Sequence, residues 1–139
     1  MRVEVHRTNE NYGMEASNET GNSIVIDSNK TSGGDDLGFR PMQMLLAAMG
    51  GCSAIDVITI LKKQKLEPFD LSVILDGERD MGKDANLWKT IHAHFIIKGN
   101  VPKEKAERAV QLSIEKFCSV AITLQAAGAV ITTSVEVIN

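Results

Sequence analysis

The sequence has little cysteine and no Cys-x-x-Cys pair. Cys52 and Cys118 are the two cysteines of the 139 residues, and 66 positions separate them. Without a Cys-x-x-Cys motif, neither a thioredoxin-type redox site nor a zinc ribbon is indicated. Permanent disulfides are rare in the cytosol, where reactive or transient ones are the usual exception. The function therefore depends on whether these two thiols meet.

The sequence also lacks a block of positive charge and an apolar N-terminal segment. The formal net charge is −3, and no cluster of Lys and Arg offers the partner that nucleic-acid phosphates require. The N-terminal MRVEVHRTNENY has no signal core, so we expect no export and a cytoplasmic protein. No repeat, low-complexity segment or long linker is present. The length fits a single domain over residues 1–139.

One long apolar stretch is present, PMQMLLAAMGGCSAIDVITIL at 41–61. Several polar residues interrupt it, and Asp56 near its centre would be costly in lipid. We therefore expect a core helix rather than a membrane span. Pro41 is suited to the first helical position, where its missing N–H needs no partner, and we expect the helix to run to about Lys65.

The predicted helix is apolar on more than one face. A stripe at steps of three and four contains Leu45, Ala48, Met49, Cys52, Ile55 and Ile58. Leu46, Val57 and Leu61 widen it, which is typical of a helix buried by more than one partner. Gly50 and Gly51 each cost about 1 kcal/mol against alanine inside a helix, so we expect another backbone to approach closely there.

Alternation and turn residues place the other elements. We predict strands at 1–7, 12–17, 23–27, 71–80, 88–99 and 129–139, with Val3 and Val5 making the first strand half-buried. Pro68 ends the long-helix region. Asn100 is expected to cap a helix with Pro102 in its first turn, and a short helix at 119–128 is closed by Gly128. The apolar stripe of the first of these helices contains Ala106, Ala109, Val110, Ser113, Ile114 and Phe117. This order predicts an α+β fold with helices packed on one side of antiparallel sheet.

Other motifs are weak. The Gly-rich phosphate loop and the GxSxG nucleophile elbow are missing. His92 and His94 share one strand face and have metal-binding spacing, but no third ligand is evident. The opposite face carries the apolar Ile91, Ala93, Phe95 and Ile97, so the histidine face is expected to be solvated. Asp35 and Asp36 lack the alternating pattern of a calcium loop, which favours a solvated loop.

The two cysteines allow two interpretations each. A thiol attacks as thiolate, which requires a helix N-terminus, a cation or a hydrogen-bonding partner. Cys52 lies about three turns into its helix, where the dipole helps little, and free cysteine is often simply buried. Cys118 stands near the start of a short helix, which favours thiolate, but it also continues the apolar stripe from Ile114. Local sequence leaves packing and chemistry open for both.

The segment GGDDLGFRPMQMLLAAMGGCSAIDVITIL resembles the OsmC/Ohr family of organic-hydroperoxide reductases. That family has a glycine-containing loop, a proline, a Leu-x-Ala-Ala pattern and a cysteine eleven residues after the proline, which is the spacing of Pro41 and Cys52. Its second cysteine begins a helix, like Cys118-Ser119-Val120. The resemblance covers nearly the whole chain and includes the end strand GAVITTSVEVIN.

The resemblance implies an OsmC-like α+β fold, with antiparallel sheets and a long central helix, in an intertwined homodimer. It implies a thiol peroxidase that acts on organic or lipid hydroperoxides without metal or other cofactor. Cys52 matches the peroxidatic residue, which becomes a sulfenic acid. Cys118 matches the resolving residue, which forms a disulfide with it, and a dithiol such as a lipoylated protein then reduces the bond.

Two features of the catalytic type are not matched. Met42 stands where that type has glutamate after the proline, and NENYGMEAS contains no arginine. Arg7, Arg40 and Glu78 are the possible supporting residues. This pattern is closer to the YhfA-like branch of the family. An alternative function is a non-peroxidatic, stress-associated dimer whose apolar pocket, lined by Met42, Met44 and Met49, binds a small apolar ligand.

Overall fold

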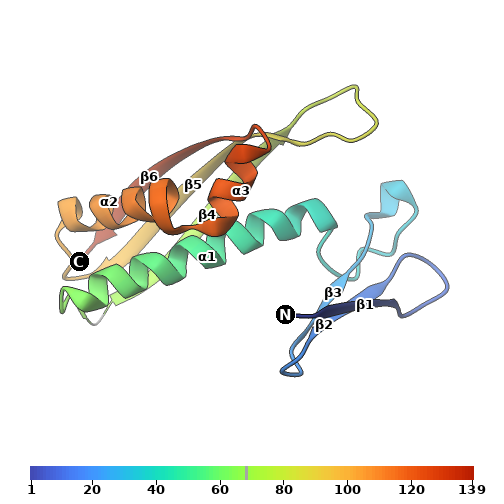
Figure 1. Cartoon of the computed structure of the whole chain (residues 1–139), viewed down its shortest axis with the longest axis horizontal. Helices are drawn as coiled ribbons and strands as arrows, with labels where there is room; N and C mark the ends of the chain where they lie inside the picture. Colours follow the sequence, from blue (N-terminus) through green and yellow to red (C-terminus); the bar gives the residue numbers. More distant parts are fainter. Residues whose placement is uncertain (68) are drawn as a thin grey trace. The chain divides into compact units, whose positions relative to one another are not determined.

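The computed structural model describes residues 1–67 and 69–139. The chain divides into two compact units, Met1–Leu45 and Leu46–Asn139, which are described separately. Pro68, predicted to end the long-helix region, lies outside the described residues. Figure 1 shows the elements in chain order.

The first unit contains a three-stranded antiparallel sheet in the order β1-β2-β3. Its strands are β1 Val3–Arg7, β2 Met14–Asn18 and β3 Ser23–Ile26, which confirms the three predicted strands. The predicted half-burial of the first strand is wrong for this unit, because all five residues of β1 are exposed. A single 3₁₀ turn, Lys30–Ser32, lies in the loop before the long helix.

Helix α1, Pro41–Lys63, begins at the predicted proline. Its buried residues are Met49, Gly50, Ser53, Val57 and Leu61. The predicted stripe is thus displaced around the helix, since Ile55 is 66% exposed. By length and composition alone α1 could cross a membrane. Met49, Val57 and Leu61, however, belong to the hydrophobic core of the protein, as expected for a core helix.

The second unit contains a sheet in the order β4-β5-β6, with β4 Phe69–Arg79, β5 Trp88–Gly99 and β6 Val130–Ile138. β4 and β5 pair antiparallel, as predicted. β6 pairs parallel to β5, which differs from the antiparallel arrangement expected for the sheet. The helical crossover between β5 and β6 explains the difference, because it returns the chain to the end of the sheet where β5 began.

This crossover consists of α2 Lys103–Leu112, a π-helical turn at Ser113–Phe117 and α3 Ser119–Ala126. The N-cap of α2 is Pro102, without a side-chain cap, so the predicted capping by Asn100 is wrong. Gly128 follows α3 with φ +106°, a left-handed conformation that favours glycine, and it closes the helix as predicted.

All three helices of this unit cover one face of the sheet (Figure 1). Alternate side chains of β5 point at them, and the opposite alternation points away. The buried positions of β5 are Ile91, Ala93, Phe95 and Ile97, as the sequence predicts. The helices contribute Ala106, Ala109, Val110, Ile114, Cys118, Ala121 and Leu124 to the same core.

The two adjacent glycines of α1 have different surroundings. A Cβ on Gly50 would lie 2.6 Å from Leu75 Cδ1, so glycine lets α1 pack closely on β4. The predicted close approach therefore exists at Gly50, but it is made by a side chain and not by a backbone. A Cβ on Gly51 would meet no described atom within 4 Å.

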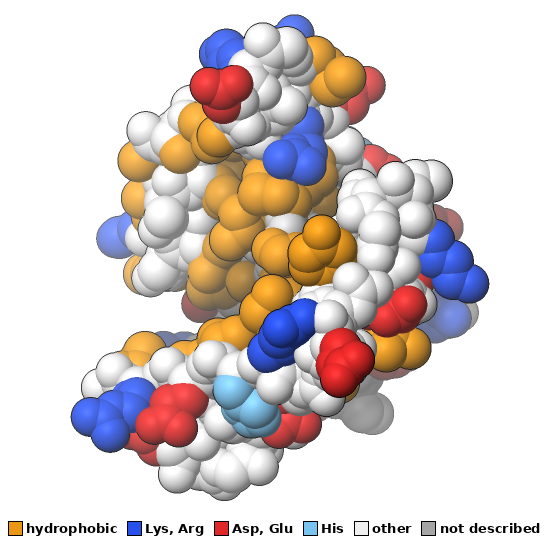
Figure 2. All heavy atoms as spheres, turned by 90° about the vertical axis from the view of Figure 1, so that its right-hand side faces the viewer, with side chains coloured by type: hydrophobic (Ala, Val, Ile, Leu, Met, Phe, Trp, Pro, Cys, Tyr) orange, Lys and Arg blue, Asp and Glu red, His pale blue; other side chains and the backbone are white. Residues whose placement is uncertain are grey.

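Large apolar side chains also remain at the surface, among charged and polar ones (Figure 2). In the first unit Val3, Val5 and Ile24 are 61%, 54% and 45% exposed. In the second unit Phe117 and Ile122 are 48% and 41% exposed. These exposed side chains do not contribute to the hydrophobic core of their own unit.

Candidate functional site

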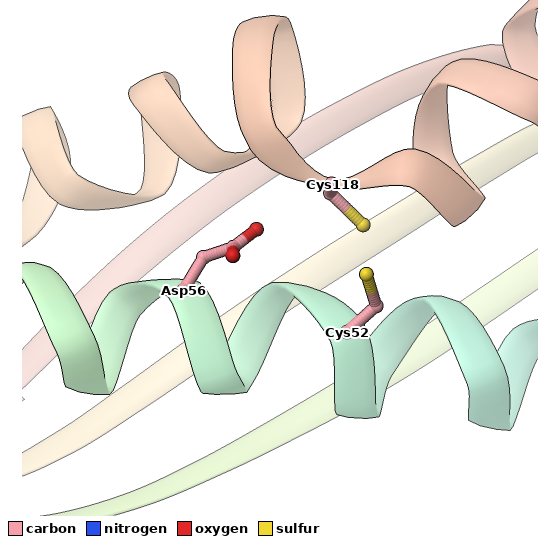
Figure 3. Close-up of side chains that lie close together, drawn as sticks. All are labelled: Cys52, Asp56 and Cys118. Carbon is pink, nitrogen blue, oxygen red and sulfur yellow. The ribbon is translucent and has the colours of Figure 1, made fainter.

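The two cysteines meet in the second unit. Cys52 lies on α1, and Cys118 lies at the junction between the π-helical turn and α3. Their side chains point toward each other, and the Asp56 carboxylate points into the same space (Figure 3). One ligand atom from each of the three side chains lies within 4.8 Å of the others.

The spacing of α1 explains why Asp56 joins the pair. Residues four apart on a helix lie on the same face, so Cys52 and Asp56 are neighbours one turn apart. Ser113 donates a hydrogen bond from Oγ to Asp56 Oδ2 at 2.9 Å. Ser113 is fully buried, so α2 and its π-helical turn hold the Asp56 carboxylate in place from across the site.

The π-helical turn positions Cys118. The Cys118 N–H donates to Ser113 O at 2.7 Å, a five-residue spacing that widens the last turn after α2. Such π turns occur frequently at functional sites. Cys118 then becomes the N-cap of α3, with φ −74° and ψ 98°. The widened turn therefore ends one helix, starts another and directs the sulfur toward α1.

The two thiols have different environments. Cys52 is half-buried and Cys118 is fully buried. Burial is the main cause that raises the pKa of Cys118 from 9.0 to about 11, and the neighbouring Cys52 and Asp56 act in the same direction. The Ala121 N–H, which donates to Cys118 Sγ at 3.4 Å, acts in the opposite direction. The predicted preference of this helix start for thiolate is outweighed by burial, so Cys118 is a thiol at neutral pH.

Comparison with known proteins identifies the family to which this chain belongs. Residues 33–134 match the family described as OsmC-like protein. This chain belongs to the OsmC-like family. Protein YhfA of Escherichia coli (strain K12) is 45% identical over 109 residues, 78% of each chain. The YhfA-like resemblance of the sequence is thereby confirmed.

Solved structures show the same fold. A structure from structural genomics is 37% identical, with a TM-score of 0.85, and the match covers 99% of this chain and 98% of that one. An organic hydroperoxide resistance protein OsmC from Legionella pneumophila, described as a predicted redox protein, is 17% identical with a TM-score of 0.73. That match covers 97% of this chain and 95% of the Legionella chain and shows similarity of fold.

The three possible supporting residues, Arg7, Arg40 and Glu78, belong to two different units of the chain. Glu78 lines an open pocket of ≈ 510 Å³ with Asp76, Thr90 and His92, on the outer side of the sheet. Arg7 and Arg40 belong to the first unit. The Arg7 guanidinium donates to the carbonyls of Asn11 and Glu10. A supporting role for these three residues stays a prediction.

The three methionines expected to line an apolar pocket differ in how deeply they are buried. Met49 is fully buried in the core, and its carbonyl oxygen lies 3.9 Å from Cys118 Sγ. Met49 therefore packs beside the thiols and does not line an open pocket. Met42 and Met44 are half-buried in the first unit, and their role stays a prediction.

The other polar groups form ordinary contacts. His92 contacts the hydroxyls of Thr132 and Ser134 at 2.7 and 2.9 Å, and His94 contacts Ser134 at 2.7 Å. In the described part of the chain neither histidine belongs to a group of three ligating side chains. Asp35 and Asp36 are exposed in a loop, as predicted.

Sequence reasoning missed the roles of Asp56 and Ser113. Asp56 is a charge in an apolar run, and its position one helical turn after Cys52 is the signal that could have placed it at the site. Ser113 belonged to the predicted buried stripe, and a serine in such a stripe needs a hydrogen-bond partner. Nothing local indicated that this partner would be Asp56, 57 positions earlier.

Proposed function

We propose that this protein is a thiol peroxidase that reduces organic hydroperoxides. The observation that carries the proposal is that the Cys52 and Cys118 sulfurs lie within 4.8 Å of each other, although 66 positions separate them in sequence. Two cysteines packed merely as apolar fillers have no need to face each other across two elements. The OsmC-like family includes hydroperoxide reductases, which supports the same assignment.

The environments of the thiols support a division of roles. Cys52 is the half-buried thiol, so it is the one that a hydroperoxide can reach. Cys118 is fully buried and protonated at neutral pH, which suits a residue that waits for an intermediate to form beside it. We therefore assign Cys52 as the peroxidatic residue and Cys118 as the resolving residue.

The cycle balances with one hydroperoxide and one dithiol. The Cys52 thiolate attacks the distal oxygen of ROOH, the O–O bond breaks, and the alkoxide leaves and takes a proton to give ROH. Cys52 is then a sulfenic acid. The Cys118 sulfur attacks the Cys52 sulfur, the S–O bond breaks, and the hydroxyl leaves with the Cys118 proton as water. A dithiol reduces the disulfide by two exchange steps and becomes a disulfide itself.

Intact mass after one equivalent of cumene hydroperoxide tests the proposal. The reduced chain is expected to lose two hydrogens, and peptide mapping is expected to join Cys52 to Cys118. Cys118→Ser is expected to stop at a Cys52 sulfenic acid that dimedone traps, and Cys52→Ser is expected to stay unmodified. Retention of both free thiols in the wild-type protein would contradict the proposal.

We propose further that the active form is a cytoplasmic homodimer. The exposed apolar side chains of the first unit support this, because Val3, Val5 and Ile24 lie on one face of the β1-β2-β3 sheet with no cover from that unit. Large exposed apolar surfaces commonly mark interaction sites. Light scattering of the protein as it elutes from a size-exclusion column should give a molar mass twice that of one chain.

A further inference from the structure

The cluster of Cys52, Asp56 and Cys118 has an electrostatic feature that peroxide chemistry does not use. A carboxylate lies within 4.8 Å of both sulfurs. A cation beside a sulfur favours the loss of the thiol proton, whereas an anion opposes it. Among residues 1–67 and 69–139, none of the Lys, Arg or His ion pairs includes Asp56. A carboxylate beside two sulfurs is an arrangement suited to receiving a cation.

The donor atoms match one class of cation. Two thiolates and one carboxylate carry three negative charges when ionised, which a divalent cation offsets. Zinc binds sulfur at about 2.3 Å and carboxylate oxygen at about 2.0–2.2 Å in tetrahedral geometry, so its ligand atoms lie roughly 3.5–3.8 Å apart. The three atoms here lie within 4.8 Å of one another, so small side-chain rotations on fixed elements bring them to that spacing.

The mixture of ligands narrows the choice of metal. Magnesium and calcium prefer sites made of oxygen, and copper(I) prefers thiolates and thioethers. Two sulfurs with one carboxylate oxygen favour Zn²⁺, for which Co²⁺ is a spectroscopic substitute. Three protein ligands leave one tetrahedral position for water.

A supporting partner for the carboxylate is already present. Ser113 Oγ donates to Asp56 Oδ2 at 2.9 Å, which leaves the other carboxylate oxygen for a metal. Hydrogen bonds of this kind orient ligating carboxylates, and their removal typically weakens metal binding about 10–100-fold. The buried Ser113 is therefore a positioning residue for the metal site.

We propose that Cys52, Cys118 and Asp56 form a Zn²⁺ site in the reduced protein, with Ser113 orienting the carboxylate. Binding replaces two thiol protons with one Zn²⁺, and both protons pass to solvent. Zinc-bound thiolates and the disulfide are then mutually exclusive states of the same sulfurs. The metal site does not depend on the peroxidase activity, since it requires only the reduced thiols and the carboxylate.

Anaerobic titration of the full-length reduced protein with Co²⁺ tests the proposal in the absence of peroxide. We expect thiolate-to-cobalt charge-transfer absorption that saturates at one metal per chain and disappears on addition of Zn²⁺. Zn²⁺ is also expected to raise the Tm of the wild-type protein, because it binds the folded state. Absence of the charge-transfer absorption in the wild-type protein would overturn the proposal.

Variants separate the three-ligand site from a thiol pair that binds metal alone. Asp56→Asn is expected to lower the Zn²⁺ affinity at least about tenfold, and Ser113→Ala by roughly tenfold. Cys52→Ser should abolish most of the absorption. Asp70→Asn, which changes an exposed carboxylate of the same unit, is the matched control and should leave the affinity unchanged. An unchanged affinity in Asp56→Asn would refute the carboxylate as a ligand.

If a variant does not fold, the Co²⁺ titration of the wild-type protein still decides whether the metal site exists. Cooperative thermal unfolding of each metal-free variant identifies the folded ones. The result is also independent of the peroxidase assay, because a protein that forms the disulfide with hydroperoxide but binds no Co²⁺ refutes only the metal site. A protein that binds Co²⁺ but retains free thiols after hydroperoxide refutes only the peroxidase function.

Discussion

The two units of the chain use apolar residues in different ways. In the second unit, alternate residues of β5 are buried beneath three helices, and the opposite alternation contains Thr90, His92 and His94. In the first unit the same alternation produces a sheet whose apolar side chains stay exposed, and Ala16 is its one buried hydrophobic residue. The apolar residues of the second unit form the hydrophobic core of that unit. The exposed apolar residues of the first unit form a surface that a partner can cover.

This difference shows why the candidate site lies where it does. Cys52, Asp56 and Cys118 all belong to the second unit, where packed helices and sheet hold side chains in fixed positions. A site that requires three ligand atoms within a few ångströms needs such rigid support. The first unit offers exposed area instead, which suits association.

The largest expected effect is in the core of the second unit. Phe95→Ala removes a fully buried ring from the centre of β5 and is expected to cost about 3–5 kcal/mol of unfolding free energy. Urea unfolding at one fixed protein concentration measures it. A loss below about 1 kcal/mol would mean that this core does not carry the stability of the unit.

A smaller effect is expected in the first unit, and of a different kind. Val5→Asp places a charge on the exposed apolar face and is expected to raise the dimer dissociation constant at least about tenfold, or about 1.4 kcal/mol. Sedimentation equilibrium measures the constant. Ser23→Asp, on the opposite face of the same sheet, is the control. Equal effects of the two substitutions would show that the Val5 face is not the association surface.

The smallest effect distinguishes two neighbouring positions on α1. Gly51→Ala fills open space in a helix and is expected to raise the unfolding free energy by about 0.5–1 kcal/mol. Gly50→Ala meets Leu75, so the displacement of that side chain should cancel this gain or reverse it by about 1 kcal/mol. Paired thermal melts measure the difference. A larger gain at Gly50 would contradict the close packing of α1 on β4.

The sequence predicts much of this fold because local patterns and caps are strong. Pro41 begins α1, Gly128 closes α3, and the alternation of β5 identifies its buried face. The orientation of α1 was harder to predict, since a helix apolar on several faces does not indicate which face the sheet covers. The parallel pairing of β6 also had no local signal, because strand direction depends on how the crossover packs.

The candidate site was predictable in part. The family resemblance pairs Cys52 with Cys118, and the structure places their sulfurs within 4.8 Å of each other. The π-helical turn and the contact of Ser113 with Asp56 depend on the docking of the crossover onto α1, which no short stretch encodes. The stripe that predicts Ala106, Ala109 and Ile114 as buried does not show that the turn widens after Leu112.

The parallel pairing of β5 and β6 affects when the site can form during folding. Thr90 pairs with Val130, so 40 positions of chain must be arranged before this part of the sheet closes. Non-local pairings of this kind form slowly, because the entropy of loop closure must be overcome before the contacts are gained. Cys118 lies inside that crossover and reaches Cys52 only when the crossover docks. A newly made chain therefore keeps its thiols apart until its sheet is complete.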